Sequence, residues 1–87
     1  MMLEFARSLS GHDKDQIYLI LEKEERAAYL VNGRTHKLEK PKKKNKKHYQ
    51  IIKHIPEDIL AQLNKNGPLT DDIIYESLRA YERSINK

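Results

Sequence analysis

The clearest structural signal in this chain is AAYLVNG, residues 27–33, a short apolar run that ends in an Asn-Gly pair. Asn-Gly is typical of the two-residue turn of a β-hairpin, because both central positions of that turn need a positive φ angle. The run therefore predicts a strand over 27–31, a tight turn at Asn32 and Gly33, and a returning strand over 35–38.

Further short strands are predicted on both sides of this hairpin. Segments 3–9, 16–21 and 47–53 are β-rich or alternate between apolar and polar residues, and turn signals or charged turns separate them. Short strands joined by tight turns favour a small curled antiparallel sheet or barrel over a βαβ unit. Closure into a barrel would also remove exposed sheet edges.

The spacing of apolar residues becomes helical after this region. Pro56 suits the first position of a helix, and Glu57 and Asp58 suit the positive end of its dipole. NGP at 66–68 is a stop signal, and Thr70 is a good N-cap for a second helix. One face of that helix carries apolar residues at i, i+4, i+7 and i+11. These residues are Ile74, Leu78, Tyr81 and Ile85. Both short helices need an apolar surface, and the sheet is the simplest candidate.

A strongly basic run lies between the hairpin and the helices. KPKKKNKKH, residues 40–48, holds six lysines in nine residues and no acid. Such a run repels itself, so we expect a solvated loop that stays out of the core. Over residues 34–53, nine Lys/Arg face the single Glu39, a balance of +8, so the rest of this +4 chain carries −4.

An acidic scaffold with one basic stripe favours a polyanionic partner, and nucleic acid comes first. An anionic membrane is disfavoured, because the run has no flanking bulky apolar face and no lipidation motif. Pro41 stiffens the run, while His48 and Tyr49 offer rings that can stack on an unpaired base. A core or sheet-face position for Tyr49 is the slightly favoured alternative. A solvated loop without a ligand is the alternative for the run as a whole.

The sequence shows little of the residue spacing that is typical of catalytic or metal-binding sites. The carboxylates are scattered or lie in helix first turns, and the serines and glycines form no nucleophile elbow or phosphate loop. None of the four histidines has another histidine at helical i+3 or i+4 spacing. We therefore expect no enzyme activity, no cofactor and no metal. The 87 residues suit one small domain, and the lack of cysteines, of a secretory signal and of a membrane-length apolar run favours the cytoplasm.

Three motifs resemble those of the KOW-domain RNA-binding proteins, small bacterial relatives of KOW-class ribosomal proteins of the large subunit. They are ARS leading to SGHD within 6–13, VNGR at 31–34, and LEKPKKKN followed by KH within 38–48. The resemblance covers residues 3–52. Their combination is more specific than the Gly-x-Asp turn alone.

This resemblance implies a mainly β fold with α-helices: a small SH3-like (KOW) β-barrel over residues 1–54, followed by two short C-terminal helices over 55–87 in the same domain. It implies that the barrel loops contact structured RNA, with ribosomal RNA foremost and ribosomal proteins as further partners. The implied RNA-binding residues are Arg7, Ser10, Gly11, His12 and Lys14 in the first loop, Arg34 in the hairpin, and Lys40, Lys42, Lys43, Lys44, Lys46, Lys47 and His48 in the basic loop 40–48.

Two departures from the family pattern affect this expectation. Asp15 stands where KOW sequences usually have glycine, which would reshape the first turn. His12 and His36 stand where arginine is frequent, which would weaken phosphate contacts at neutral pH. A protein-interaction module of the same fold, acting in translation or transcription, is the main alternative function. A double-stranded DNA binder is a weaker one.

Overall fold

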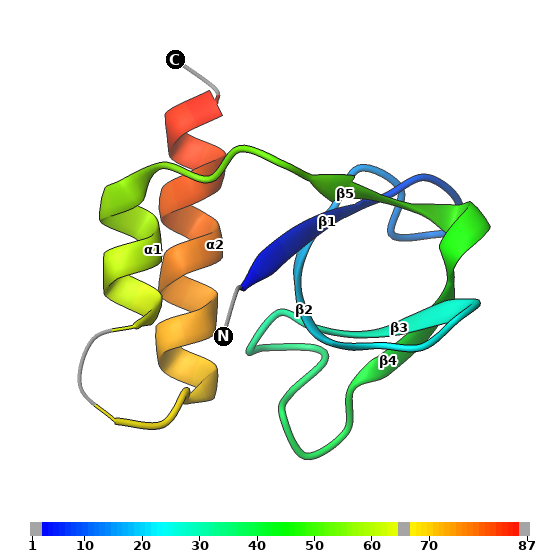
Figure 1. The fold of residues 1–87 in the computed structure, drawn as a ribbon, viewed down its shortest axis with the longest axis horizontal. Coiled ribbons are helices and arrows are strands. Elements are labelled where there is room, and N and C mark those ends of the chain that lie inside the picture. The colour runs from blue at the N-terminus through cyan, green and yellow to red at the C-terminus, as the bar shows by residue number, and fades with distance from the viewer. Residues whose placement is uncertain (1–2, 65–66, 86–87) are drawn as a thin grey trace.

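The computed structural model describes residues 3–64 and 67–85, which form a curled antiparallel sheet followed by two helices (Figure 1). The elements are β1 (Glu4–Ser8), β2 (Ile17–Lys23), β3 (Ala27–Val31), β4 (Lys42–Asn45), the 3-10 turn η1 (Lys46–His48), β5 (Tyr49–Ile52), α1 (Glu57–Leu63) and α2 (Asp71–Ile85). The strand order is β4-β3-β2-β1-β5. The mainly β architecture with two C-terminal helices is therefore confirmed.

The curled sheet has two apolar faces, and β2 contributes to both. Ile17 and Leu19 belong to a cluster with the helices, on the outer face. Tyr18 and Ile20 belong to a second cluster inside the curl, the inner face, together with residues of β1, β3 and β5. This alternation follows from the two-residue period of a strand.

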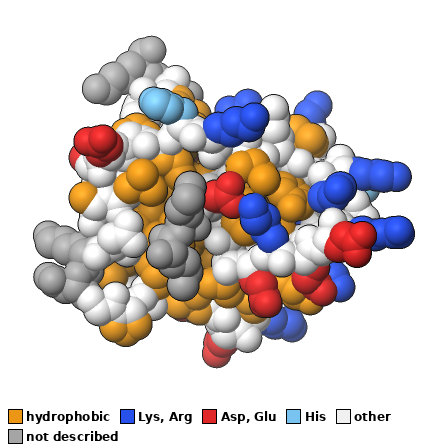
Figure 2. Space-filling view, viewed as in Figure 1, with side chains coloured by type: hydrophobic (Ala, Val, Ile, Leu, Met, Phe, Trp, Pro, Cys, Tyr) orange, Lys and Arg blue, Asp and Glu red, His pale blue; other side chains and the backbone are white. Residues whose placement is uncertain are grey.

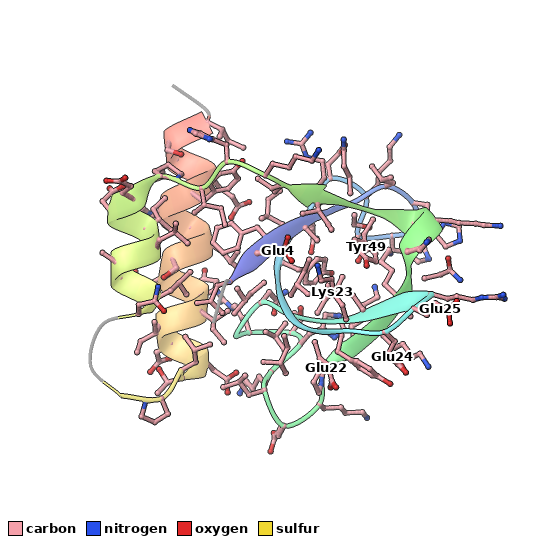
Figure 3. The ribbon with its side chains drawn as sticks, viewed as in Figure 1. Glu4, Glu22, Lys23, Glu24, Glu25 and Tyr49 are labelled. Carbon is pink, nitrogen blue, oxygen red and sulfur yellow. The ribbon has the colours of Figure 1, made fainter. Side chains whose placement is uncertain are left out.

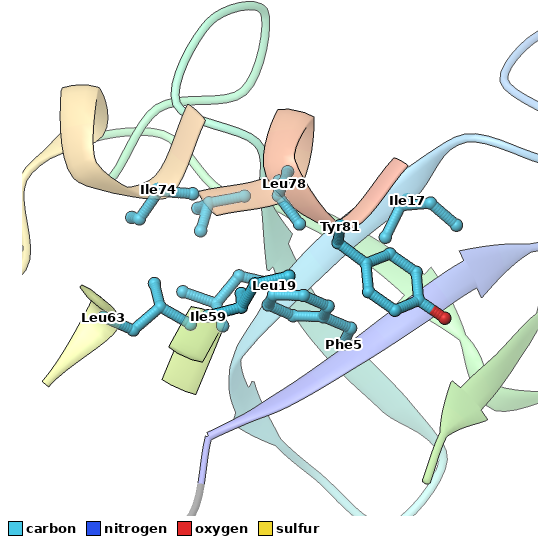
Figure 4. Close-up of a cluster of buried hydrophobic side chains, with 9 residues drawn as sticks. Phe5, Ile17, Leu19, Ile59, Leu63, Ile74, Leu78 and Tyr81 are labelled. Carbon is cyan, nitrogen blue, oxygen red and sulfur yellow. The ribbon is translucent and has the colours of Figure 1, made fainter. Parts of the chain in front are cut away.

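The two helices lie side by side (Figure 1), and their apolar side chains pack against those of the outer face (Figure 4). Tyr81 of α2 meets Phe5 of β1 edge-on, with ring centroids 5.4 Å apart. Ile74 and Leu78 are buried with Tyr81, as the helical spacing predicts. Ile85 is the exception on this stripe, because it ends the helix and stays 47% exposed.

The helix starts agree with the predicted caps only in part. The Thr70 hydroxyl accepts a hydrogen bond from the backbone N–H of Ile73 at 3.2 Å, which confirms its capping role. Pro56 lies at the N-cap position with ψ of 143°, so it precedes α1 instead of forming its first turn. Asn66 of the predicted stop signal lies outside the described residues.

The predicted strand over 35–38 is wrong, because residues 32–41 form a loop. The Asn32 side-chain Oδ1 accepts hydrogen bonds from the backbone N–H groups of Arg34, Thr35 and His36 at 2.9–3.0 Å, which folds the start of this loop onto itself. β4 is the strand that pairs with β3, with Leu30 opposite Lys42 and Ala27 opposite Asn45. Part of the predicted basic loop is therefore a strand.

This loop rests on the first turn of α2. Gly33 has a φ of +76°, and a Cβ on it would overlap the carbonyl oxygen of Asp71 and lie 2.9 Å from the backbone nitrogen of Tyr75. The backbone N–H of Leu38 donates to Asp71 Oδ1 at 2.8 Å. The loop is thus fixed by a close backbone approach that only glycine permits.

Gly33→Ala should destabilise the fold more than Gly67→Ala. Both glycines have positive φ, which costs a substituted alanine about 1–2 kcal/mol. Only Gly33 faces α2, and relief of that overlap should add ~1–3 kcal/mol. Urea unfolding of the two variants measures the difference. Equal destabilisation would show that the approach of the loop to α2 is not constrained.

Candidate functional site

The side chain of Asp13 is the centre of a buried polar cluster. Asp13 is 8% exposed and lies in the loop between β1 and β2. Its Oδ1 accepts hydrogen bonds from Ser8 Oγ at 2.9 Å and Lys44 Nζ at 3.0 Å. Its Oδ2 accepts from Tyr18 Oη at 2.7 Å and Lys42 Nζ at 2.8 Å. One carboxylate thus joins the first loop to β1, β2 and β4.

These contacts keep the carboxylate ionised. Burial alone would raise the pKa of Asp13, but the hydrogen bonds from Lys42, Tyr18, Lys44 and Ser8 outweigh it and hold the pKa well below its usual value. The pKa of Tyr18 is raised, first by burial and then by its bond to Asp13. At neutral pH the cluster therefore holds one negative charge between two lysine ammonium groups.

Two of the three lysines of β4, Lys42 and Lys44, point inward. Cross-strand pairing puts Lys42 and Lys44 on the inner face with Leu30 and Ala28, and Lys44 is 9% exposed. Lys43 lies on the opposite face, where it pairs with Glu24 at 3.5 Å. The expectation that the whole run stays out of the core is wrong, because Asp13 compensates the charge of the inward-pointing lysines.

The cluster also draws the neighbouring loops together. Lys44 Nζ donates to the carbonyl of Ser10 at 3.1 Å, and the backbone N–H of Leu9 donates to the carbonyl of His48 at 2.8 Å. On the other side, the rings of Tyr18 and His36 lie 6.0 Å apart. Gln16 of the first loop, residues 9–16, lines a groove with Arg34 and Thr35, so this loop adjoins both loop 32–41 and η1.

His36, one of the departures from the family pattern, lies beside the Asp13 cluster. Its pKa is lowered, chiefly by burial and then by the positive charge of Lys42. His36 is therefore neutral at pH 7 and adds no positive charge to this surface. Asp15, the other departure, has a φ of +72°, so it adopts the left-handed conformation for which glycine is usual.

Exposed basic side chains lie on the first loop, on loop 32–41 and on η1, and we call this set the basic rim. Its members are His12 and Lys14 on the first loop, Lys37 and Lys40 on loop 32–41, and Lys46, Lys47 and His48 on η1. Within residues 3–64 and 67–85, none of these five lysines forms an ion pair. Asp15 and Glu39 are exposed acids on the same segments. Figure 2 shows most of the visible Lys and Arg on the part of the molecule away from the helices, with Asp and Glu among them.

Four residues implied by the resemblance are not members of the basic rim. Two of them lie elsewhere on the fold, and two act through their backbone. Arg7 is half-buried on the outer face, opposite Ile17 and Gln50. Arg34 reaches α2, where its Nη1 donates to the Tyr75 hydroxyl at 2.6 Å. Gly11 shapes the first turn with a φ of +89°, and Ser10 supplies the carbonyl bound by Lys44.

Tyr49 is a core residue. It is 8% exposed and belongs to the inner apolar cluster. The preferred interpretation of Tyr49 is therefore confirmed, and base stacking on its ring is excluded in this conformation.

An acidic turn borders η1. Glu22, Glu24 and Glu25 lie on or beside the β2–β3 turn, and Glu4 and Lys23 point toward one another across the opening of the curl (Figure 3). Lys23 Nζ lies 2.7 Å from Glu4 Oε1, and this hydrogen bond raises the pKa of Lys23. The side of η1 toward this turn therefore carries exposed carboxylates.

The chain matches no protein-family model and no curated protein. Neither helix that the structure describes has the length and apolar content that a membrane crossing requires. No group of three His, Asp or Glu side chains is placed to hold a metal ion, as far as the described residues go. The interpretation of the basic rim rests on its geometry and charge.

Asp13→Asn should lower the free energy of unfolding by ~3–5 kcal/mol, because it leaves Lys44 buried without a counter-charge. Asp15→Asn is the matched control, since Asp15 is exposed and asparagine tolerates positive φ. That control should change stability by less than about 0.5 kcal/mol. Urea unfolding at pH 7 measures both. An Asp13→Asn variant as stable as the control would remove the cluster from its central role.

The stability contributed by Asp13 should depend on pH in the acid range. Its pKa is lowered in the folded state, whereas the unfolded value is about 3.9, so the unfolded chain takes up this proton first as the pH falls. The contribution is therefore complete above roughly pH 5 and is lost progressively below about pH 4. The stability difference between the wild type and Asp13→Asn should narrow between pH 6 and pH 3. A constant difference across that range would contradict the assignment.

Proposed function

We propose that this protein is a non-enzymatic RNA-binding protein that holds RNA phosphates on the basic rim. The observation that carries the proposal is that some lysines near Asp13 form internal ion pairs and others are exposed without one. Lys42 and Lys44 join β4 to the first loop through Asp13, whereas the lysines exposed on the first loop, on loop 32–41 and on η1 have no carboxylate partner in the described structure. When exposed, unpaired ammonium groups neutralise phosphates, the counterions condensed on the nucleic acid are released, and this release drives association.

The resemblance to KOW-domain proteins supports RNA as the nucleic acid. Under this proposal the curled sheet is an SH3-like barrel of the KOW type, and ribosomal RNA is the target. The first loop and the basic run supply the family-like contacts from neighbouring positions. Lysines act as point charges and do not form the two-pronged contacts of arginine, so recognition should depend on backbone position and RNA shape more than on base identity.

The proposed contact set is narrower than the full basic run. Lys42, Lys43 and Lys44 are removed from it, because each is paired with Asp13 or Glu24. Lys37 is added, because it is exposed on the loop that Lys42 anchors. The charged members are then Lys14, Lys37, Lys40, Lys46 and Lys47, with His12 and His48 beside them.

If each of these five lysines neutralises one phosphate, the logarithm of the RNA affinity should fall with log salt at a slope of about −3.5 to −4.5. Replacing Lys46 and Lys47 by serine should make the slope shallower by about 1.4 to 1.8. The control is Lys53→Ser with Arg83→Ser, which removes the same charge from exposed positions after β5 and at the end of α2. Filter binding to a structured RNA at several salt concentrations measures the slopes.

Equal slopes for the two double variants would mean that only net charge matters and would contradict the basic rim.

Capture of partners from lysate, with and without ribonuclease, distinguishes RNA binding from a protein-interaction role. Partners that persist after digestion would favour the protein-interaction module. Partners lost on digestion, and sedimentation with the large ribosomal subunit, would support the proposal.

A further inference from the structure

A groove runs between α2 and the start of loop 32–41, beside the basic rim. It encloses about 300 Å³, and its lining includes Arg34, Tyr75 and Arg79, with Gln16, Leu78 and Glu82 around them. This size is at the lower end of the range for small-ligand sites, roughly 300–1,000 Å³. The groove suits one planar group of modest size and is too small for a duplex.

The groove combines one aromatic ring with two arginines near it. The guanidinium carbon of Arg34 lies 5.2 Å from the centroid of the Tyr75 ring, and that of Arg79 lies 5.9 Å from it. Arg34 Nη1 also donates to the Tyr75 hydroxyl at 2.6 Å, which holds this exposed arginine at the mouth of the groove. Neither arginine forms an ion pair in the part of the chain that the structure describes.

The groove is continuous with the basic rim. Arg34 and Thr35 also border a second hollow, whose lining includes Lys37 and Lys40 of the rim. A phosphodiester chain that follows those lysines is therefore led to Arg34 and the mouth of the groove. Glu82, one helical turn beyond Arg79, lines the groove and disfavours a phosphate there, so the phosphate belongs on the Arg34 side.

We propose that this groove receives one unpaired nucleotide of the bound RNA, with its base against Tyr75 and Arg79 and its phosphate on Arg34. Unpaired bases stack on aromatic rings and on guanidinium planes, and these contacts tolerate any base. The amide of Gln16 offers hydrogen bonds to a base edge at the same place. This inference rests on the proposed RNA-binding function and adds a preference for RNA with a bulged or looped-out residue.

The test uses two RNA hairpins that differ only by a single-nucleotide bulge, and it compares their affinities for the full chain. The wild type should bind the bulged hairpin about tenfold more tightly, as expected for one stacked base. Tyr75→Ala and Arg79→Ala should each reduce this preference, while affinity for the paired hairpin changes less than about twofold for Arg79→Ala. Arg83→Ala is the control, because Arg83 is exposed on the same helix but does not line the groove.

Arg79→Ala decides the outcome if Tyr75→Ala fails to fold by circular dichroism, since Arg79 is exposed and Tyr75 is half-buried. Equal affinity of the wild type for both hairpins, or a preference unchanged in Arg79→Ala, would overturn the groove assignment and leave the basic rim in place. Binding of neither hairpin by the wild type would overturn the proposed function itself.

Discussion

Charge compensation at one buried carboxylate organises this molecule. Asp13 accepts hydrogen bonds from two hydroxyls and two ammonium groups, and through them it joins the first loop to three strands. A buried ion pair adds little stability compared with an apolar replacement of equal shape, but it is costly to break on one side. Here the ion pairs of Asp13 fix the position of the segments around it, and these segments carry the exposed basic groups.

The fold was predictable where apolar periodicity dominates. β2 and the buried stripe of α2 follow from two-residue and helical spacing, and AAYLV at 27–31 is β3 as predicted. β4 was not predictable in this way, because it contains three lysines and one asparagine. Its strand character depends on a partner 29 and 31 residues earlier in the chain, which accepts both inward-pointing ammonium groups. The two-residue spacing of Lys42 and Lys44 was the available signal.

The sequence indicated which segments form the candidate site, but not which of their residues are exposed. The first loop and the basic run both stood out from composition and from the resemblance, and backbone hydrogen bonds bring them together. Apart from the two-residue spacing of Lys42 and Lys44, the run gave no sign of which lysines pair internally, because that pairing depends on Asp13 in another part of the chain. The neighbourhood of Arg34 was also hidden, since Tyr75 lies 41 residues further along the chain. Long-range contacts of this kind have no local sequence signature.

The outer apolar face has a consequence for how the chain acquires its structure during synthesis. Phe5, Ile17 and Leu19 belong to the first third of the chain, yet their burial depends on Leu78 and Tyr81 near its far end. Translation proceeds from the N-terminus, so the strands leave the ribosomal tunnel while this face is still uncovered. The nascent sheet therefore exposes an apolar face until α2 has emerged, and premature termination before that helix would leave this face open to aggregation.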